Sequence, residues 1–182
     1  MSDFWALKHR MADAINAHDL HEILSHYSPD AVYVGPSGVA EGFEQIAWVY
    51  EQIFAAFPDF HVTAWYEVAD CENPAVTEWT YTGTHTGPLL LPDGREIAGT
   101  GCRITLRATC TSFVENGKIK THREYFDQLE LYSQLGFGLT KSRHAAHNLH
   151  VERNGQSRTE EIRRLAPRNG NVVVKLRRHG RT

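Results

Sequence analysis

Three side chains in the stretch 121–127 (THREYFD) could carry proton-transfer chemistry: His122, Glu124 and Asp127. A histidine and a carboxyl group held together can take and return protons near neutral pH. His122 and Glu124 are two positions apart, so in a β-strand they share one face. The alternative for this pair is a solvated or mutually paired arrangement on that strand. Asp127 is followed three residues later by Glu130, which is typical of a capping box at the start of a helix.

The turn before this stretch decides which face the two side chains occupy. A two-residue Asn-Gly loop places Glu124 opposite Thr109, among polar groups. A three-residue loop at 115–117, with Gly117 in the left-handed conformation, places Glu124 opposite Ala108 instead. The slip of one residue moves every following side chain to the other face of the sheet.

We favour the three-residue loop, because it sets His122 and Glu124 into an apolar face. In this register His122 lies opposite Cys110, and Phe126 lies opposite Leu106. A carboxyl group on such a wall has a raised pKa, since desolvation penalises its charged form. That suits a general acid or base. The same register pairs sensible partners elsewhere along the hairpin: Phe113 with Ile119, Thr111 with Thr121, and Arg107 with Tyr125.

Further pocket candidates come from other predicted strands and helices. His85 lies in TGTHTG, where the glycines indicate a bend or a close backbone approach. Tyr33, Phe54 and Trp79 could supply flat apolar walls for a ligand. The competing interpretation is that these residues belong to the core, with the Tyr33 hydroxyl bonded to backbone and His85 structural.

The elements that must position these groups follow from periodicity. Apolar spacing predicts helices over 3–17, 19–27 and 43–57. Alternating patterns predict strands over 31–35, 60–68, 76–87, 102–114 and 118–127. A short helix then ends at Gly136. Helices first and long strands afterwards indicate an α+β fold, in which a curved antiparallel sheet wraps over the N-terminal helices.

The 182 residues are 41% hydrophobic, which suits one globular domain with an appendage. Residues 1–139 hold 8 Lys and Arg against 19 Asp and Glu, whereas residues 140–182 hold 11 against 3. We therefore expect an acidic domain over 1–139 and a basic tail over 140–182 that is disordered or loosely docked, with VVVKL at 172–176 able to form a small strand. The tail lacks aromatic interleaving, which argues against nucleic-acid binding.

The chain has three cysteines without paired spacing, which fits a reducing cytoplasm. No run of eighteen apolar residues and no signal-peptide layout are present, so we expect no membrane span.

Glycine-rich phosphate loops, H-E-x-x-H and serine elbows are missing as well, and we expect no cofactor and no metal. A zinc site at the tail histidines 144, 147 and 150 is a weak alternative. In the favoured register Cys110 as a nucleophile has only His122 as a neighbour that could become positive.

Four segments together resemble a known family: FPDF, TGTHTG, VENGKI and GKIKTHREYFDQLELYSQLG. They are similar to the SnoaL-like polyketide cyclase or ester cyclase family, within the superfamily that shares the cone-shaped fold of nuclear transport factor 2. The resemblance covers about residues 3–139, and the tail has no counterpart in it. It implies the same α+β cone and, for assembly, a homodimer formed through the outer face of the sheet, where Arg107 and Tyr125 lie.

The resemblance also implies roles for particular residues. Members of the family close a polyketide ring by intramolecular aldol condensation, without metal or cofactor. Their acid/base carboxylate is an aspartate two residues after a histidine, positions that match Glu124 and His122. His85 matches a pocket histidine and Asp127 a second carboxylate. Glutamate in place of aspartate, and Cys110 in place of a second catalytic histidine, indicate a different substrate, a different reaction or no reaction. The epoxide-hydrolase variant of the cone uses an Asp-Arg-Asp trio, which is disfavoured because Arg123 faces away from Glu124.

The sequence therefore predicts a cofactor-free cyclase or isomerase with a hydrophobic substrate. Glu124 would take a proton next to a carbonyl, and His122 or His85 would donate to the oxyanion. The predicted pocket walls are Tyr33, Phe54, Trp79, Leu106, Ala108, Cys110 and Phe126. The alternative is a non-catalytic module of the same fold that binds a hydrophobic ligand or dimerises.

Overall fold

The computed structural model describes residues 3–66, 73–91, 94–139 and 176–178. It divides into two compact units, Met1–Gly136 and Phe137–Thr182. The second unit contains β9 (Phe137–Leu139) and β10 (Leu176–Arg178), which pair antiparallel with Leu176 opposite Leu139. The rest of the predicted tail, including 172–175 and the three tail histidines, lies outside the described residues, so its disorder stays a prediction.

Three helices form one layer of the first unit: α1 (Asp3–Asn16), α2 (Leu20–Ser25) and α3 (Gly42–Ala56). Their apolar stripes are buried, as the periodicity requires. Asp19 caps α2, because its side chain accepts a hydrogen bond from the backbone N–H of Glu22. All three helices end one or two residues before the bounds predicted from sequence. Pro58 lies two residues after the end of α3, where it prevents the helix from continuing.

The other layer is a six-stranded sheet in the order β2-β1-β8-β7-β4-β3. Its strands are β1 (Tyr27–Gly35), β2 (Gly38–Glu41), β3 (His61–Tyr66), β4 (Ala75–Thr84), β7 (Arg103–Glu115) and β8 (Lys118–Phe126). The sheet is mixed and not wholly antiparallel as predicted, because β1 runs parallel to β8. The first strand also begins earlier than predicted, at Tyr27, and includes Pro29. Residues 67–68 of the predicted third strand lie outside the described residues.

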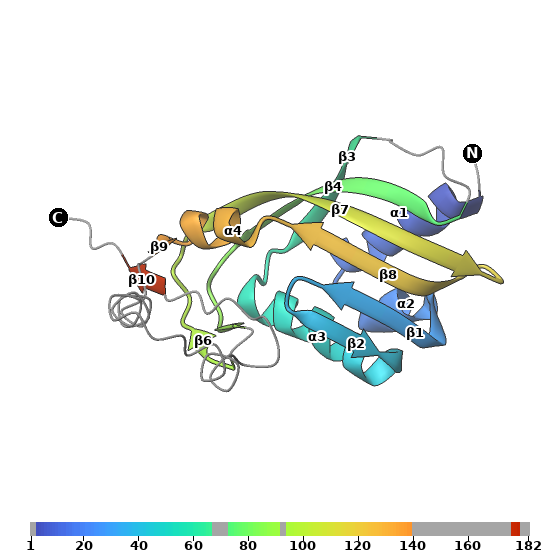
Figure 1. The fold of residues 1–182 in the computed structure, drawn as a ribbon, viewed down its shortest axis with the longest axis horizontal. Coiled ribbons are helices and arrows are strands. Elements are labelled where there is room, and N and C mark those ends of the chain that lie inside the picture. The colour runs from blue at the N-terminus through green and yellow to red at the C-terminus, as the bar shows by residue number, and fades with distance from the viewer. Residues whose placement is uncertain (1–2, 67–72, 92–93, 140–175, 179–182) are drawn as a thin grey trace, which may run out of the picture. The chain divides into compact units, whose positions relative to one another are not determined.

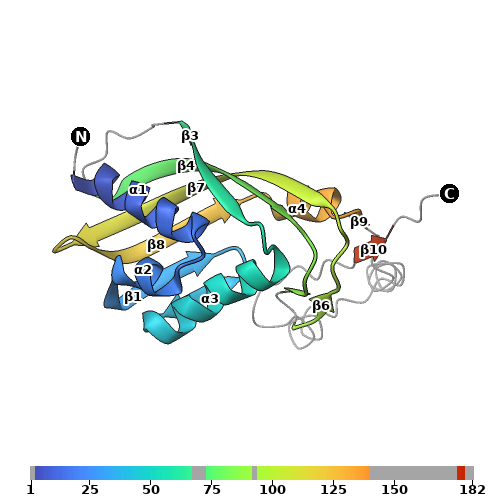
Figure 2. The ribbon, with the colours of Figure 1, turned by 180° about the vertical axis from the view of Figure 1, so that it is seen from behind.

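Within the first unit the helices cover one face of the curved sheet (Figures 1 and 2). The core fills the space between the layers, with Met11, Ile23, Tyr27, Ile46 and Ile119 almost fully buried. On the opposite face of the sheet Tyr125 and Phe113 are 55% and 39% exposed. Short elements complete the unit: β5 (Leu89–Leu90), β6 (Glu96–Ile97) and α4 (Gln128–Gln134), which ends before Gly136 at φ 85°. No helix of the described residues is both long and apolar enough to cross a bilayer.

The β7–β8 turn differs from the three-residue loop that we favoured from sequence. Asn116 and Gly117 form a two-residue loop with φ of 51° and 74°, and Glu115 pairs with Lys118. Both central residues are left-handed, which matches a type I′ turn and the right-handed twist of the strands. The pairings that we predicted for Phe113, Thr111 and Arg107 are therefore wrong. Phe113 pairs with Thr121, Thr111 with Arg123, and Thr109 with Tyr125.

A β-bulge then returns Glu124 to the apolar face. The register shifts between Val114, which pairs with Ile119, and Phe113, which pairs with Thr121, so no residue of β7 lies opposite Lys120. An extra residue in one strand exchanges its two faces. Glu124 now pairs with Cys110, two residues from the predicted partner Ala108 and on the same side of the sheet. His122 pairs with Ser112 instead of Cys110, and Phe126 with Ala108 instead of Leu106.

Candidate active site

A cavity of about 390 Å³ lies between the helices and the sheet of the first unit. Its walls come mainly from α3, β1, β7 and β8 and are mostly apolar. Glu124 and His122 are among the few polar groups in these walls. Val39 and Trp48, which also line the cavity, are 60% and 49% exposed. The apolar mouth that they form is suited to a hydrophobic ligand.

Glu124 is held inside this cavity by a tyrosine on the neighbouring strand. Only 7% of Glu124 is exposed, and its Oε2 accepts a hydrogen bond of 2.9 Å from the Tyr33 hydroxyl. Burial raises the pKa of Glu124, because desolvation penalises the carboxylate. The Tyr33 hydrogen bond, the charge of Lys8 and the Tyr81 hydroxyl act in the opposite direction. The result is a carboxyl group that titrates closer to neutral pH than an exposed glutamate.

His122 is held by a second set of tyrosines. Its Nδ1 lies 2.6 Å from the Tyr27 hydroxyl, which in turn lies 3.0 Å from the Tyr50 hydroxyl. Burial lowers the pKa of His122 well below its ordinary value, so the ring is neutral at pH 7. Its Nε2 is buried and has no hydrogen-bond partner among the described residues. An unsatisfied nitrogen on a cavity wall is available to a ligand.

A buried lysine, which the sequence reasoning missed, lies next to Ser112 and Cys110. Lys8 on α1 is 2% exposed, and its Nζ donates to Ser112 Oγ over 3.4 Å. Burial lowers the pKa of Lys8, while the neighbouring Cys110 and Glu124 raise it. Its position gave a signal, since Lys8 is three residues before Met11 and lies within the apolar stripe of α1. A lysine within the apolar stripe of a helix predicts that its amine is buried and that an acidic side chain lies nearby.

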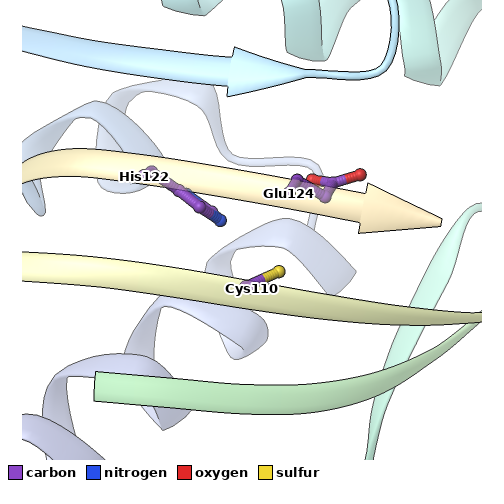
Figure 3. Close-up of side chains that lie close together, drawn as sticks. All are labelled: Cys110, His122 and Glu124. Carbon is purple, nitrogen blue, oxygen red and sulfur yellow. The ribbon is translucent and has the colours of Figure 1, made fainter. Parts of the chain in front are cut away.

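Cys110 completes the polar group on this face. Its Sγ lies 3.4 Å from the Tyr81 hydroxyl, and burial raises its pKa to about 12, so it is a neutral thiol. One ligand atom each of Cys110, His122 and Glu124 lie within 4.8 Å of one another (Figure 3). A small void of about 20 Å³ next to Cys110 is also lined by Lys8 and Trp79.

His85 and Asp127 lie apart from this group. His85 is fully buried; its Nδ1 accepts from the backbone N–H of Thr100 over 3.3 Å, and its ring packs on Phe57 with centroids 5.3 Å apart. It does not line the cavity. Asp127 is the N-cap of α4 and accepts from the backbone N–H groups of Leu129 and Glu130. That is the structural alternative set out above, and it is confirmed.

The predicted pocket walls fall into three groups. Tyr33, Leu106 and Phe126 line the cavity, while Trp79 and Cys110 line only the small void. Ala108 and Phe54 line neither, and the Phe54 ring stacks on His18 with centroids 4.1 Å apart. Several further wall residues were not singled out from sequence: Trp48, Tyr50, Ile53, Tyr81 and Tyr132.

Comparisons with known proteins identify the family to which the chain belongs. The family model described as SnoaL-like polyketide cyclase matches residues 6–135. The chain belongs to the SnoaL-like polyketide cyclase family. The match covers nearly all of the first unit, from α1 to the end of α4. The part of the family prediction that named SnoaL-like cyclases is thus confirmed, whereas a comparison with curated proteins finds no match.

Several solved structures share the fold. AclR of Streptomyces galilaeus, described as a candidate hydroxylase, is 26% identical with a TM-score of 0.60, over 72% of this chain and 93% of AclR. IdmH of Streptomyces antibioticus, described as a candidate polyketide cyclase, is 24% identical with a TM-score of 0.61, over 72% of this chain and 96% of IdmH. A protein of ketosteroid isomerase-like fold from Catenulispora acidiphila is 17% identical with a TM-score of 0.59, over 71% and 92% of the two chains. The curved α+β cone is therefore established.

Proposed function

We propose that the protein is a small-molecule cyclase or isomerase in which Glu124 transfers a proton next to a carbonyl without a cofactor. The observation that carries this proposal is the Glu124 carboxyl group in the wall of an apolar cavity, where Tyr33 holds it over 2.9 Å. A base must be ionised yet close to neutral in pKa, and burial together with one hydrogen-bond donor supplies both conditions.

The proton transfer uses groups that line the cavity. The Glu124 carboxylate takes the proton from the carbon next to the carbonyl, and the electrons of that C–H bond move to the carbonyl oxygen. The Nε2–H of His122, which has no hydrogen-bond partner among the described residues, donates to that oxygen as its charge develops. This role requires the tautomer in which Nδ1 accepts a hydrogen bond from Tyr27.

The enolate then has two outcomes. In an isomerisation, protonated Glu124 returns its proton at another carbon. In an aldol cyclisation, the enolate carbon attacks a second carbonyl of the same substrate, and the new alkoxide takes the proton. Both reactions need an apolar site that excludes water, and the aromatic and aliphatic walls provide one. The substrate class is an enolisable bicyclic or tricyclic carbonyl compound.

The alternative function is binding without catalysis. It is favoured by Cys110, because a thiol cannot orient a carbonyl as the family's second histidine does. The two functions differ in whether a bound ketone exchanges its protons.

We also propose that the protein forms a homodimer through the face of the sheet opposite the helices, where Phe113 and Tyr125 are exposed. Sedimentation of the Tyr125→Glu variant tests this, because a charge at such an interface weakens association.

Deuterium exchange into 2-tetralone, a bicyclic ketone with acidic protons next to its carbonyl, tests the catalytic proposal. The protein is mixed with 2-tetralone in D₂O, and loss of the proton signal is followed by NMR. We expect exchange above the buffer rate, and a fall of about 10²–10⁴-fold in Glu124→Gln. Glu115→Gln, which changes an exposed glutamate at the hairpin, is the matched control and should retain the rate.

Two outcomes would contradict the base role of Glu124. If 2-tetralone shifts the NMR signals of cavity residues but exchanges only at the buffer rate, the protein is a binding module for this class of ligand. If Glu124→Gln exchanges as fast as the unchanged protein, another group is the base.

A further inference from the structure

Three different metal-ligand types lie close together beside the cavity. Cys110 and Glu124 are direct cross-strand partners on β7 and β8, and His122 precedes Glu124 by two residues on the same face. Their ligand atoms lie within 4.8 Å of one another, and all three residues are buried. Figure 3 shows the three side chains close together on the two neighbouring strands. One sulfur, one nitrogen and one oxygen ligand thus lie within 4.8 Å of one another.

The His122 ring is held in place, and one of its two nitrogens is available to a ligand. His122 is 3% exposed, and its Nε2 has no hydrogen-bond partner among the described residues. Its other nitrogen, Nδ1, lies 2.6 Å from the Tyr27 hydroxyl, which fixes the ring. Metal-binding histidines are commonly held in this way, with one nitrogen on the metal and the other hydrogen-bonded to a neighbouring group.

We propose that Cys110 Sγ, His122 Nε2 and the Glu124 carboxylate form a binding site for Zn²⁺. Thiolate and imidazole select zinc over the hard ions Mg²⁺ and Ca²⁺, which prefer oxygen ligands alone. Three protein ligands leave a fourth position free. Because His122 and Glu124 line the cavity, a water molecule or a small-molecule ligand can reach that position from the cavity.

Only small movements are needed to close the site. With metal–ligand lengths of about 2.0–2.3 Å, the ligand atoms around a tetrahedral zinc ion lie roughly 3.5 Å apart. The longest separation, 4.8 Å, therefore shrinks by roughly 1 Å. Rotation of the Glu124 carboxylate away from Tyr33 and a turn of the Cys110 side chain provide this movement.

Charge decides the strength of this site. Zinc with one thiolate and one carboxylate is neutral, and the thiol proton of Cys110 leaves when the ion binds. Lys8 opposes the ion when it is protonated, because it lines the small void next to Cys110 and its Nζ lies 3.4 Å from the hydroxyl of Ser112, the cross-strand partner of His122.

Zinc would also regulate the reaction, a consequence that rests on the proposed function. The ion binds the carboxylate lone pairs that Glu124 needs as a base and the His122 nitrogen that donates to the oxyanion. Zinc is therefore expected to stop deuterium exchange into 2-tetralone, and a chelator is expected to restore it.

Cobalt substitution tests the binding site independently of activity. The test protein carries Cys71→Ser and Cys102→Ser, which leave Cys110 as the single thiol, and alanine at the tail histidines 144, 147 and 150. Addition of Co²⁺ should give the ultraviolet thiolate-to-cobalt charge-transfer band and saturate at one ion per chain. Zn²⁺ should then remove the band by displacing cobalt.

Variants of the ligands and of their neighbours sharpen the test. Cys110→Ala should lose the band, and His122→Gln should weaken zinc binding at least about tenfold by calorimetry, with circular dichroism confirming the fold of each. Tyr27→Phe should weaken zinc about 10- to 100-fold, because it frees the His122 ring. Lys8→Met removes the opposing charge and should tighten binding.

The zinc site would be overturned by either of two results. One is a folded single-thiol protein that gives no thiolate-to-cobalt band. The other is a band that persists in Cys110→Ala. Because the band does not depend on turnover, a failure of the exchange experiment leaves this test unaffected, and a failure of this test leaves the exchange result standing.

Discussion

Tyr33 donates a hydrogen bond of 2.9 Å to Glu124 between β1 and β8, the parallel pair of strands in the six-stranded sheet. The two residues are 91 positions apart in the chain, so this contact exists only when the sheet is complete. Burial and the hydrogen bond have opposite effects on the carboxyl group. Burial favours its neutral form, whereas the donor favours the carboxylate.

The first prediction follows from removing the donor. In Tyr33→Phe the pKa of Glu124 should rise further, because the carboxylate loses a charge-assisted hydrogen bond. Such a bond contributes about 1.5–3 kcal/mol, which corresponds to about one to two pH units. The measurement is an NMR titration of the ¹³C-labelled Glu124 carboxyl. Tyr125→Phe, on the exposed face of the same strand as Glu124, is the control and should leave the titration unchanged.

A second prediction concerns stability against pH. The folded pKa of Glu124 is above the unfolded value of about 4.3, so the folded chain binds more protons between the two values. Stability therefore falls as pH rises through this window, by up to about 1.4 kcal/mol for each pH unit of difference. Glu124→Gln should lack this fall. Urea unfolding across the window measures it, and parallel curves for the variant and the unchanged protein would contradict the buried carboxyl.

His122 gives the third prediction, with the opposite sign. Its folded pKa lies well below the unfolded value of about 6.5, so the unfolded chain binds more protons below that pH. Stability is lost as pH falls from there, and His122→Gln should reduce the loss. Some loss should remain, because burial also lowers the pKa of His26 and His85. His61→Gln, at an exposed position, is the control, and an equal effect from it would show that the loss is not specific to His122.

Local patterns in the sequence were sufficient for the helices and the long strands of the first unit, but not for the short strands β2, β5 and β6. The apolar spacing of α3 and the alternation of β4 and β7 each describe one element and its neighbours, and the structure reproduces them within a few residues. The face of Glu124 was predicted correctly but from the wrong turn. A bulge at Lys120, not a three-residue loop, reverses the strand, and both devices insert one residue. Because either change adds one residue before Glu124, the odd–even alternation of the sequence could not distinguish a longer loop from a bulge.

The partners of the site residues could not be predicted in the same way. Tyr27 bonds His122 across 95 positions, and Lys8 bonds Ser112 across 104. These contacts depend on the parallel β1–β8 pairing and on the packing of α1, which no local pattern encodes. His85 illustrates the reverse error. The glycines around it did indicate close packing, yet that packing encloses the ring against Phe57 instead of turning it into the cavity.

The fourth prediction tests whether the turn at Gly117 or the bulge at Lys120 sets the register of β8. Gly117 has φ 74°, and a Cβ built on it meets no heavy atom within 4 Å, so Gly117→Ala should cost only backbone strain. That cost is about 1–2 kcal/mol, measured by urea unfolding. Asn116→Gly, at the neighbouring left-handed residue, is the matched control and should change stability by less than about 0.5 kcal/mol.

The pKa of Glu124 decides what Gly117 does for the site. Because the bulge at Lys120 lies between the turn and Glu124, a destabilised but folded Gly117→Ala protein should titrate Glu124 at the unchanged pH. A shift of that pKa toward the value of an exposed glutamate would mean that the strand has slipped and turned the carboxyl to solvent. The turn would then set the register, and the bulge would only follow it.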